Sequence, residues 1–397
     1  MRKCDGIRGY IEGYYGRLLS WPQRRELLDH LQQCGMNHYW YAPKEDIRHR
    51  LHWRRPYAQS WRDAFAQFCQ RASRQGVSVV AGMAPGLDFD FAHLSAYCAG
   101  ERDADADNDM SVLVKKSREL MSAGAAVPAL LLDDIDADFP QRCGDFNSEG
   151  AAHAQLANQL GEALGLPLWV VPRIYADELA SDAPGYLPDF VTQLDPQHTI
   201  VYCGSHIVTA DINPDQGVAG LPSSHSRVYW DNLYANDYCP RKLYLGPWSG
   251  RSGVQHIMLN PTGLPETDKL LLSVMTAADS ASTGELAWRK TLVEAGVPDV
   301  FFSLRDYFDH PPVPGQGAPT LPVVNPAEAD AQMAALEQLL WRWKTSLSRE
   351  WYQFLMSLKH DLLLANDELA FDRIVKTQSI PLTARLLGDK LNQRMPE

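Results

Sequence analysis

The chain has 397 residues, 45% of them hydrophobic, and a formal net charge of −12 at pH 7. This length is enough for one large α/β domain with an appendage, or for two to three ordinary domains. The acidic balance repels nucleic-acid phosphates, so we expect no nucleic acid among the partners of this protein.

The seven cysteines are scattered along the chain, and no two have the CxxC spacing of a zinc or redox motif. This pattern favours reduced thiols over a disulfide framework. The N-terminus lacks the apolar stretch of a secretory signal, and no segment reaches the ~18 consecutive apolar residues that a membrane helix needs. We therefore expect a soluble, cytoplasmic protein that does not associate with membranes.

Short apolar or aromatic segments recur along the first two thirds of the chain, and helical patterns lie between most of them. The first helical pattern has Ser20 as a candidate N-cap, Pro22 in its first turn and Gly35 beyond its end. Strands that alternate with helices are typical of parallel βαβ units. The predicted strands are residues 7–16, 38–44, 77–86, 129–135, 168–175, 199–204, 227–232 and 256–261.

Eight such strands predict an α/β fold, a (β/α)8 barrel of the TIM type with a C-terminal helical extension. A doubly wound sheet is the structural alternative. The barrel is favoured because polar residues follow the C-terminal ends of nearly all eight segments, where a barrel places its active site. The expected domains are a catalytic barrel, a helical segment with a Pro/Gly-rich linker, and a small helical module, over residues 1–280, 281–326 and 327–397.

The C-terminal module has a clear apolar periodicity. Met333, Leu336, Leu340, Trp343 and Leu347 follow one another at spacings of three and four, which predicts one amphipathic helix that continues into the next apolar segment. The apolar stripe is generous for a surface helix. We therefore expect the helical tail to support a homodimer.

The strand predicted at 129–135 ends with two adjacent carboxylates, Asp133 and Asp134. Such a pair is electrostatically costly unless a metal, a cation or a reaction that needs two acids offsets the cost. Consecutive strand residues face opposite sides, so both reach one pocket only if the backbone leaves regular geometry there. The alternatives are that one Asp caps a helix while the other pairs with an arginine, or that residues 133–138 bind a divalent metal in a loop.

The other predicted strands also end in Lys, Asp, Asn, Tyr and Trp, a set that suits a sugar. Five segments resemble, in order, the signature of family 84 glycoside hydrolases, which includes protein O-GlcNAcases and related β-N-acetylglucosaminidases. They are EGYYGR (12–17), YAPKEDIRHR (41–50), APGLD (84–88), LLLDDID (130–136) and WDNLYANDY (230–238).

The resemblance implies a retaining exo-β-N-acetylglucosaminidase that uses no metal and no organic cofactor, and whose substrate is a glycoconjugate bearing N-acetylglucosamine. The oxygen of the substrate's own 2-acetamido group attacks the anomeric carbon and forms an oxazoline, so the usual enzymic nucleophile is absent. By position in the motif, Asp133 orients the acetamido group. Asp134 protonates the leaving oxygen and then deprotonates water.

The resemblance also implies sugar contacts near the first strands. Gly13 is expected to meet a sugar hydroxyl through its carbonyl oxygen, although a turn that needs positive φ would also explain the glycine. Lys44 is expected to bind a hydroxyl, and Tyr175 to bind near the acetamido oxygen. His49 and His52 have the HxxH spacing of a metal site, but His49 belongs to the family motif and is interpreted as structural.

Four residues from the last strands complete the expected site. Trp230 corresponds to an aromatic wall of the acetamido pocket and Asn232 to a polar contact near the reacting centre. Asp237 and Asn260 correspond to the pair that holds the hydroxyls at C4 and C6. The functional alternatives are a catalytically silent barrel that binds N-acetylglucosamine and, less favoured, a metal-dependent diphosphate enzyme.

Overall fold

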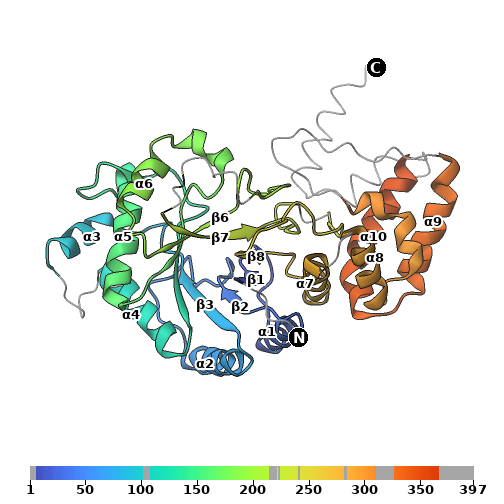
Figure 1. Cartoon of the computed structure of the whole chain (residues 1–397), viewed down its shortest axis with the longest axis horizontal. Helices are drawn as coiled ribbons and strands as arrows, with labels where there is room; N and C mark the ends of the chain where they lie inside the picture. Colours follow the sequence, from blue (N-terminus) through green and yellow to red (C-terminus); the bar gives the residue numbers. More distant parts are fainter. Residues whose placement is uncertain are drawn as a thin grey trace, which may run out of the picture.

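The computed structural model describes residues 6–365 except 102–107, 214–220, 222–223, 240–241, 281–283 and 310–325. Its strands form one closed parallel barrel in sequence order, in which β1 pairs with both β2 and β8 (Figure 1). This confirms the predicted (β/α)8 barrel and excludes the doubly wound sheet. The strands are β1 (Arg8–Glu12), β2 (His38–Tyr41), β3 (Ser78–Met83), β4 (Val127–Leu131), β5 (Trp169–Val171), β6 (Thr199–Tyr202), β7 (Ser226–Asp231) and β8 (Ile257–Leu259).

Helices cover the outside of this barrel. The first begins and ends as predicted: the side chain of Ser20 accepts a hydrogen bond from the Gln23 N–H, the Gln23 side chain accepts one from the Ser20 N–H, and Gly35 beyond its end has a φ of 72°. The helices are α1 (Trp21–Gln33), α2 (Gln59–Arg74), α3 (Phe91–Cys98), α4 (Asp109–Ser122), α5 (Glu149–Leu164), α6 (Tyr186–Gln193) and α7 (Pro265–Ser280).

The interior of the barrel is filled by a separate apolar cluster that includes three tryptophans. Trp40 packs edge-to-face against Trp169 and Trp230, with ring centroids 5.5 and 5.2 Å apart. Aromatic side chains of this size fill the space between the strands. They therefore form a packed layer beneath the residues that follow the C-terminal ends of the strands.

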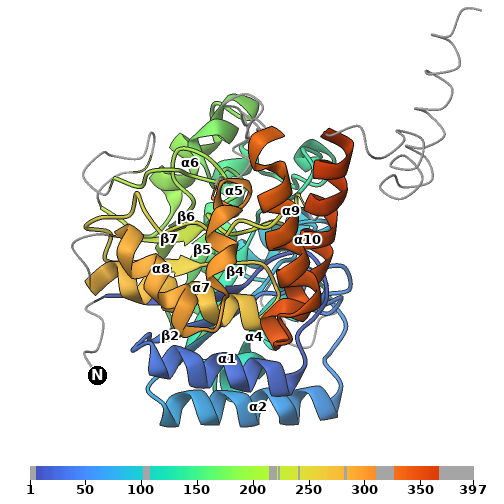
Figure 2. The same ribbon diagram turned by 90° about the vertical axis from the view of Figure 1, so that its right-hand side faces the viewer.

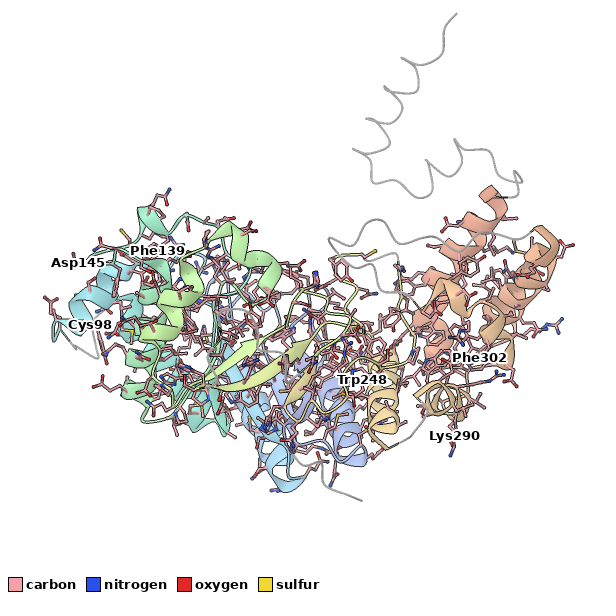
Figure 3. The ribbon with its side chains drawn as sticks, turned by 45° about the horizontal axis from the view of Figure 1, so that its top comes forward. Cys98, Phe139, Asp145, Trp248, Lys290 and Phe302 are labelled. Carbon is pink, nitrogen blue, oxygen red and sulfur yellow. The ribbon has the colours of Figure 1, made fainter. Side chains whose placement is uncertain are left out.

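The C-terminal helices form a group beside α7 (Figures 1 and 2). They are α8 (Gly284–Glu294), α9 (Pro326–Trp341) and α10 (Ser346–Ala365). Figure 3 shows Phe302 within this group and Lys290 pointing away from it. The Glu350 carboxylate of α10 accepts hydrogen bonds from the Glu266 and Thr267 N–H groups at the start of α7 (3.0 and 2.8 Å). Because the N-terminus of a helix attracts an anion, Glu350 joins the tail to the barrel.

The prediction of a single continuous helix in the tail is wrong. The chain leaves helical geometry after Trp341 and starts a new helix at Ser346. There, Thr345 and Ser348 cap each other, since each side-chain oxygen accepts a hydrogen bond from the other residue's N–H. The apolar spacing passes through this break unchanged, so periodicity alone did not reveal it. Most of the predicted Pro/Gly-rich linker lies outside the described residues, and none of the described helices is long and apolar enough to cross a membrane.

Asp268 is a fully buried carboxylate that ties α7 to the barrel wall. It accepts hydrogen bonds from the Tyr10 hydroxyl (2.9 Å), from the Thr262 N–H and hydroxyl (3.0 and 2.7 Å), and from the Gly263 N–H (3.1 Å). Burial raises the pKa of Asp268 from 3.8 to about 7, although the bonds from Thr262 and Tyr10 lower it in part.

We expect this raised pKa to give the protein a measurable pH dependence of stability. Between about pH 4 and pH 7 the folded state holds the Asp268 proton and the unfolded chain does not, so the free energy of unfolding falls as the pH rises. In urea denaturation, the wild type should lose about 3 kcal/mol more between pH 5 and pH 8 than Asp268→Asn loses. Equal pH slopes in the two proteins would contradict the raised pKa.

Candidate active site

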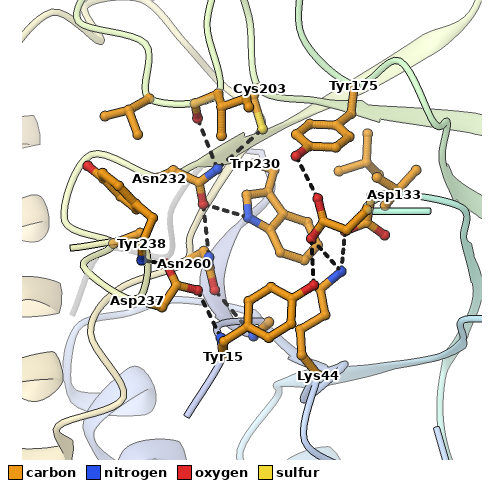
Figure 4. A pocket seen from close by; sticks show the side chains of 17 residues that line it. Tyr15, Lys44, Asp133, Tyr175, Cys203, Trp230, Asn232, Asp237, Tyr238 and Asn260 are labelled. Carbon is orange, nitrogen blue, oxygen red and sulfur yellow. Dashed lines mark hydrogen bonds and ion pairs between the residues drawn. The ribbon is translucent and has the colours of Figure 1, made fainter. Parts of the chain in front are cut away.

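A cavity of about 500 Å³ opens at the C-terminal ends of the strands, where a barrel of this type places its functional residues. All nine residues predicted for the site line this cavity. Figure 4 shows two groups on opposite sides of Trp230: Tyr175, Asp133 and Lys44 on one side, and Asn232, Asn260 and Asp237 on the other.

Asp133 and Asp134 both line the cavity although they are adjacent. Asp134 has a φ of 54°, and within the described part of the chain it is the one residue other than glycine with a positive φ. This left-handed geometry interrupts the alternation of the strand and turns the second carboxylate toward the first. The predicted departure from regular strand geometry is therefore confirmed, and such strain is typical of functional sites.

Lys44 offsets the electrostatic cost of the pair. Its buried ammonium group forms an ion pair with Asp133 Oδ2 and lies 3.4 Å from Asp134 Oδ2. Burial lowers the pKa of Lys44, but Asp133 and Asp134 outweigh this effect and leave it raised, so the lysine is charged. The other oxygen of Asp133, Oδ1, is buried and has no hydrogen-bond partner in the described structure.

Asp134 is the more open of the two carboxylates, with 31% of its side-chain surface exposed. The hydroxyls of Tyr175 and Tyr15 donate to its Oδ1 and Oδ2 at 2.8 and 3.1 Å. Burial raises the pKa of Asp134, but Lys44 and these hydroxyls outweigh it and leave the pKa below the ordinary value. A second carboxylate nearby would by itself raise the pKa of Asp134, but the ammonium group of Lys44 has the larger effect and lowers it.

The far side of the cavity is a connected set of hydrogen bonds. The Trp230 indole N–H and the Asn260 amide both donate to Asn232 Oδ1 at 2.9 Å, and Asn260 Oδ1 accepts from the Gly13 N–H at 3.2 Å. A Cβ on Gly13 would lie 2.4 Å from the Trp230 ring, whereas Gly13 is not among the glycines with positive φ. Close packing therefore explains the glycine at this position, and the alternative explanation, a turn with positive φ, is wrong.

Asp237 links this side to the first strand. Its Oδ2 accepts a hydrogen bond from the Tyr15 N–H at 2.8 Å, and its Oδ1 accepts one from the Tyr238 N–H at 2.9 Å. Tyr15 therefore reaches both ends of the cavity, since its backbone meets Asp237 and its hydroxyl meets Asp134. Both oxygens of Asp237 retain acceptor capacity for a ligand.

Several apolar residues of the cavity were not predicted. Val171 is the last residue of β5, and Cys203 is the first residue after β6. Both pack in the cluster that contains Trp230. Burial raises the pKa of the Cys203 thiol, so it acts as a neutral, small apolar group. Nothing in either residue type suggests contact with a ligand, and Val171 lies in the middle of the predicted strand 168–175, so only Cys203 had a signal, its position near the end of the predicted strand 199–204.

Within the residues that the structure describes, no three His, Cys, Asp or Glu side chains are placed to hold a metal ion. His49 is buried, and its Nδ1 hydrogen-bonds the Gly82 carbonyl oxygen at 3.0 Å. His49, the first histidine of the HxxH motif, is therefore structural, as expected.

Comparisons with known proteins agree with this geometry. A family model described as beta-N-acetylglucosaminidase matches residues 8–297. The protein O-GlcNAcases of Rattus norvegicus and Mus musculus are each 30% identical over 253 residues, which is 62% of this chain but 26% of theirs. The match thus spans about a quarter of the length of these relatives. A mutant of the Thermobaculum terrenum O-GlcNAc hydrolase shares the fold, with a TM-score of 0.66 and 18% identity over 98% of this chain and 83% of that one.

Proposed function

Because the chain belongs to the beta-N-acetylglucosaminidase family of glycoside hydrolases, we propose that it removes terminal β-linked N-acetylglucosamine from a glycoconjugate, with retention, as an exo-acting enzyme of the O-GlcNAcase type. The reaction is substrate-assisted. The observation that carries the proposal is the unpartnered Oδ1 of Asp133, a buried acceptor on the wall of the cavity. The N–H of an acetamido group is the donor it lacks.

In the first step the acetamido oxygen attacks C1 while the bond from C1 to the leaving oxygen breaks. Asp133, which forms an ion pair with Lys44, accepts the acetamido N–H and balances the positive charge that develops there. Asp134 gives its proton to the leaving oxygen, and an oxazoline that is protonated on its ring nitrogen remains beside the Asp133 carboxylate. In the second step Asp134 takes a proton from water, whose oxygen bonds to C1 from the face that the leaving group vacated. The bond from C1 to the acetamido oxygen breaks, which restores the acetamido group.

The acid role requires that Asp134 be protonated when the substrate is bound. In the free protein the pKa of Asp134 is lowered, chiefly because Lys44 outweighs the effect of burial. A bound sugar excludes water from Asp134 and gives Lys44 a hydroxyl to bind. Both changes favour the protonated acid.

The remaining residues suit the sugar itself. Trp230, with Val171, Cys203 and other apolar side chains, forms a wall of the size and character that an acetamido methyl group needs. Tyr175 lies beside this wall, and Asn232 lies near the reacting centre. Lys44 and the Gly13 carbonyl bind hydroxyls on one edge of the ring, while Asp237 and Asn260 bind those at C4 and C6.

The test is hydrolysis of 4-nitrophenyl β-N-acetylglucosaminide by the full chain in the presence of EDTA. We expect release of 4-nitrophenol, with the β-anomer of the sugar as the first product by NMR. A folded protein that binds a thiazoline analogue of the intermediate without turning over the substrate would instead be a silent sugar-binding barrel. An α-anomer first product would contradict retention.

Three assignments accompany this function as proposals. The scattered cysteines favour a cytoplasmic protein. Residues 1–280 form the catalytic barrel, and the tail supports a homodimer, for which the half-exposed Trp341 and Tyr352 on α9 and α10 provide apolar surface. Light scattering of the full chain tests the dimer, and a monomer mass would exclude it.

A further inference from the structure

The guanidinium group of Arg50 is bound directly to the backbone of Asp134 and indirectly to its carboxylate. Its Nη2 donates a hydrogen bond to the Asp134 carbonyl oxygen, and its Nη1 donates to the Tyr15 hydroxyl at 2.7 Å. The same hydroxyl donates to Asp134 Oδ2. Arg50 is thus bound both to the backbone of Asp134 and, through Tyr15, to its carboxylate. Arg50 does not line the sugar cavity.

The segment that carries Arg50 is held firmly. The Arg50 N–H donates to the Asp46 carbonyl oxygen, and the His49 carbonyl oxygen accepts from the Ala84 N–H at the end of β3. The buried ammonium group of Lys116 on α4 donates to the carbonyl oxygens of Arg48, Trp53 and Arg55. With its backbone fixed on both sides, Arg50 presents its guanidinium from a defined position, and only 9% of the residue is exposed.

This position matters because Asp134 has the unfavourable left-handed backbone. A residue with a side chain keeps that conformation only where its surroundings favour it, and the carbonyl oxygen is the atom that a change of ψ would turn away. A charged donor on this oxygen therefore stabilises the observed backbone. Nη1 of the guanidinium donates to the Tyr15 oxygen and so holds that hydroxyl in place. The hydroxyl proton is then directed to Asp134 Oδ2.

We propose that Arg50 is the positioning residue of the general acid: it selects the backbone conformation and carboxylate orientation in which Asp134 can transfer a proton to the leaving oxygen. The inference rests on the proposed glycosidase function and extends it to a residue outside the cavity. Arg50 itself moves no proton and touches no substrate.

The test compares two substrates that differ in their need for an acid. Arg50→Gln should lower kcat for a methyl β-N-acetylglucosaminide by about 10²-fold and leave KM little changed, because misplacing a catalytic group by about 1 Å has effects of this size. The 2,4-dinitrophenyl glycoside should be affected much less, since its leaving group departs without a proton. In the Asp134→Asn background, Arg50→Gln should cause no further loss.

Arg55→Gln is the matched control, an exposed arginine on the same segment whose side chain is not part of the network. Thermal unfolding and binding of the thiazoline analogue establish that each variant is folded. Tyr15→Phe removes the hydroxyl bridge alone and should reproduce part of the effect without touching a buried charge. Equal losses on both substrates, or an added loss in the Asp134→Asn background, would overturn the role of Arg50. A wild type inactive on both would overturn the glycosidase function with it.

Discussion

Asp134→Asn is expected to lower kcat/KM by about 10²–10⁴ on substrates whose leaving group is a poorly acidic alcohol, the range typical of a lost general acid. The asparagine fits the same space and can still accept the hydrogen bond from Tyr175, so the geometry should survive while the transferable proton is lost. With 2,4-dinitrophenolate as the leaving group the first step needs no proton, and the loss there should be far smaller. Steady-state kinetics on the two substrates measures this difference.

The second step offers an independent check of the same variant. In the proposed mechanism water needs a base to attack the oxazoline, but azide does not, so added azide should speed the turnover of Asp134→Asn and yield the β-glycosyl azide. The fall of wild-type kcat at rising pH should also disappear, since no acid is left to ionise in the substrate complex. Asp136→Asn, an exposed neighbour that does not line the cavity, is the control. A loss of the same size on both substrates would remove Asp134 from the acid role.

The fold was predictable because its main signal is local. Each strand is a short apolar segment, and parallel strands place their C-terminal ends together. Residues as distant as Gly13, Asp133 and Asn260 were therefore expected at one end of the barrel before any contact was known. The adjacent aspartates even indicated a backbone irregularity, because alternation would otherwise separate them.

What the sequence did not reveal depends on contacts between distant segments. Arg50 meets Asp134 across 84 positions of the chain, and although Arg50 belongs to the signature segment 41–50, nothing in that segment shows which distant residue it contacts. The lowered pKa of Asp134 likewise follows from where Lys44 places its ammonium group, after burial has acted in the opposite direction. The break in the tail was missed because Trp343, which lies within it, and Leu347 of α10 are both buried and keep the apolar spacing of one continuous helix.

Asp133→Asn is expected to lower kcat by about 10²–10³ with every leaving group, the range seen when one group that stabilises developing charge is removed. In the proposed mechanism the acetamido attack belongs to the first step for all substrates, so a good leaving group cannot replace it. Asparagine retains an oxygen that can accept the acetamido N–H. It cannot balance the positive charge on the oxazoline, and it leaves the buried Lys44 ammonium without its closest anion.

The contrast between the two variants therefore assigns the two carboxylates. Asp133 is buried, paired with Lys44 and has one unpartnered oxygen on the cavity wall, whereas Asp134 is 31% exposed, which suits the group proposed to meet the departing aglycone. Parallel kinetics on the methyl and 2,4-dinitrophenyl glycosides should show a loss that is independent of the leaving group for Asp133→Asn and dependent on it for Asp134→Asn. The Asp133→Asn variant should also bind the thiazoline analogue more weakly, because the protonated ring nitrogen loses its counter-charge. If the dependence appeared at Asp133 instead, the two roles would have to be exchanged, and the open carboxylate would be the one that orients the acetamido group.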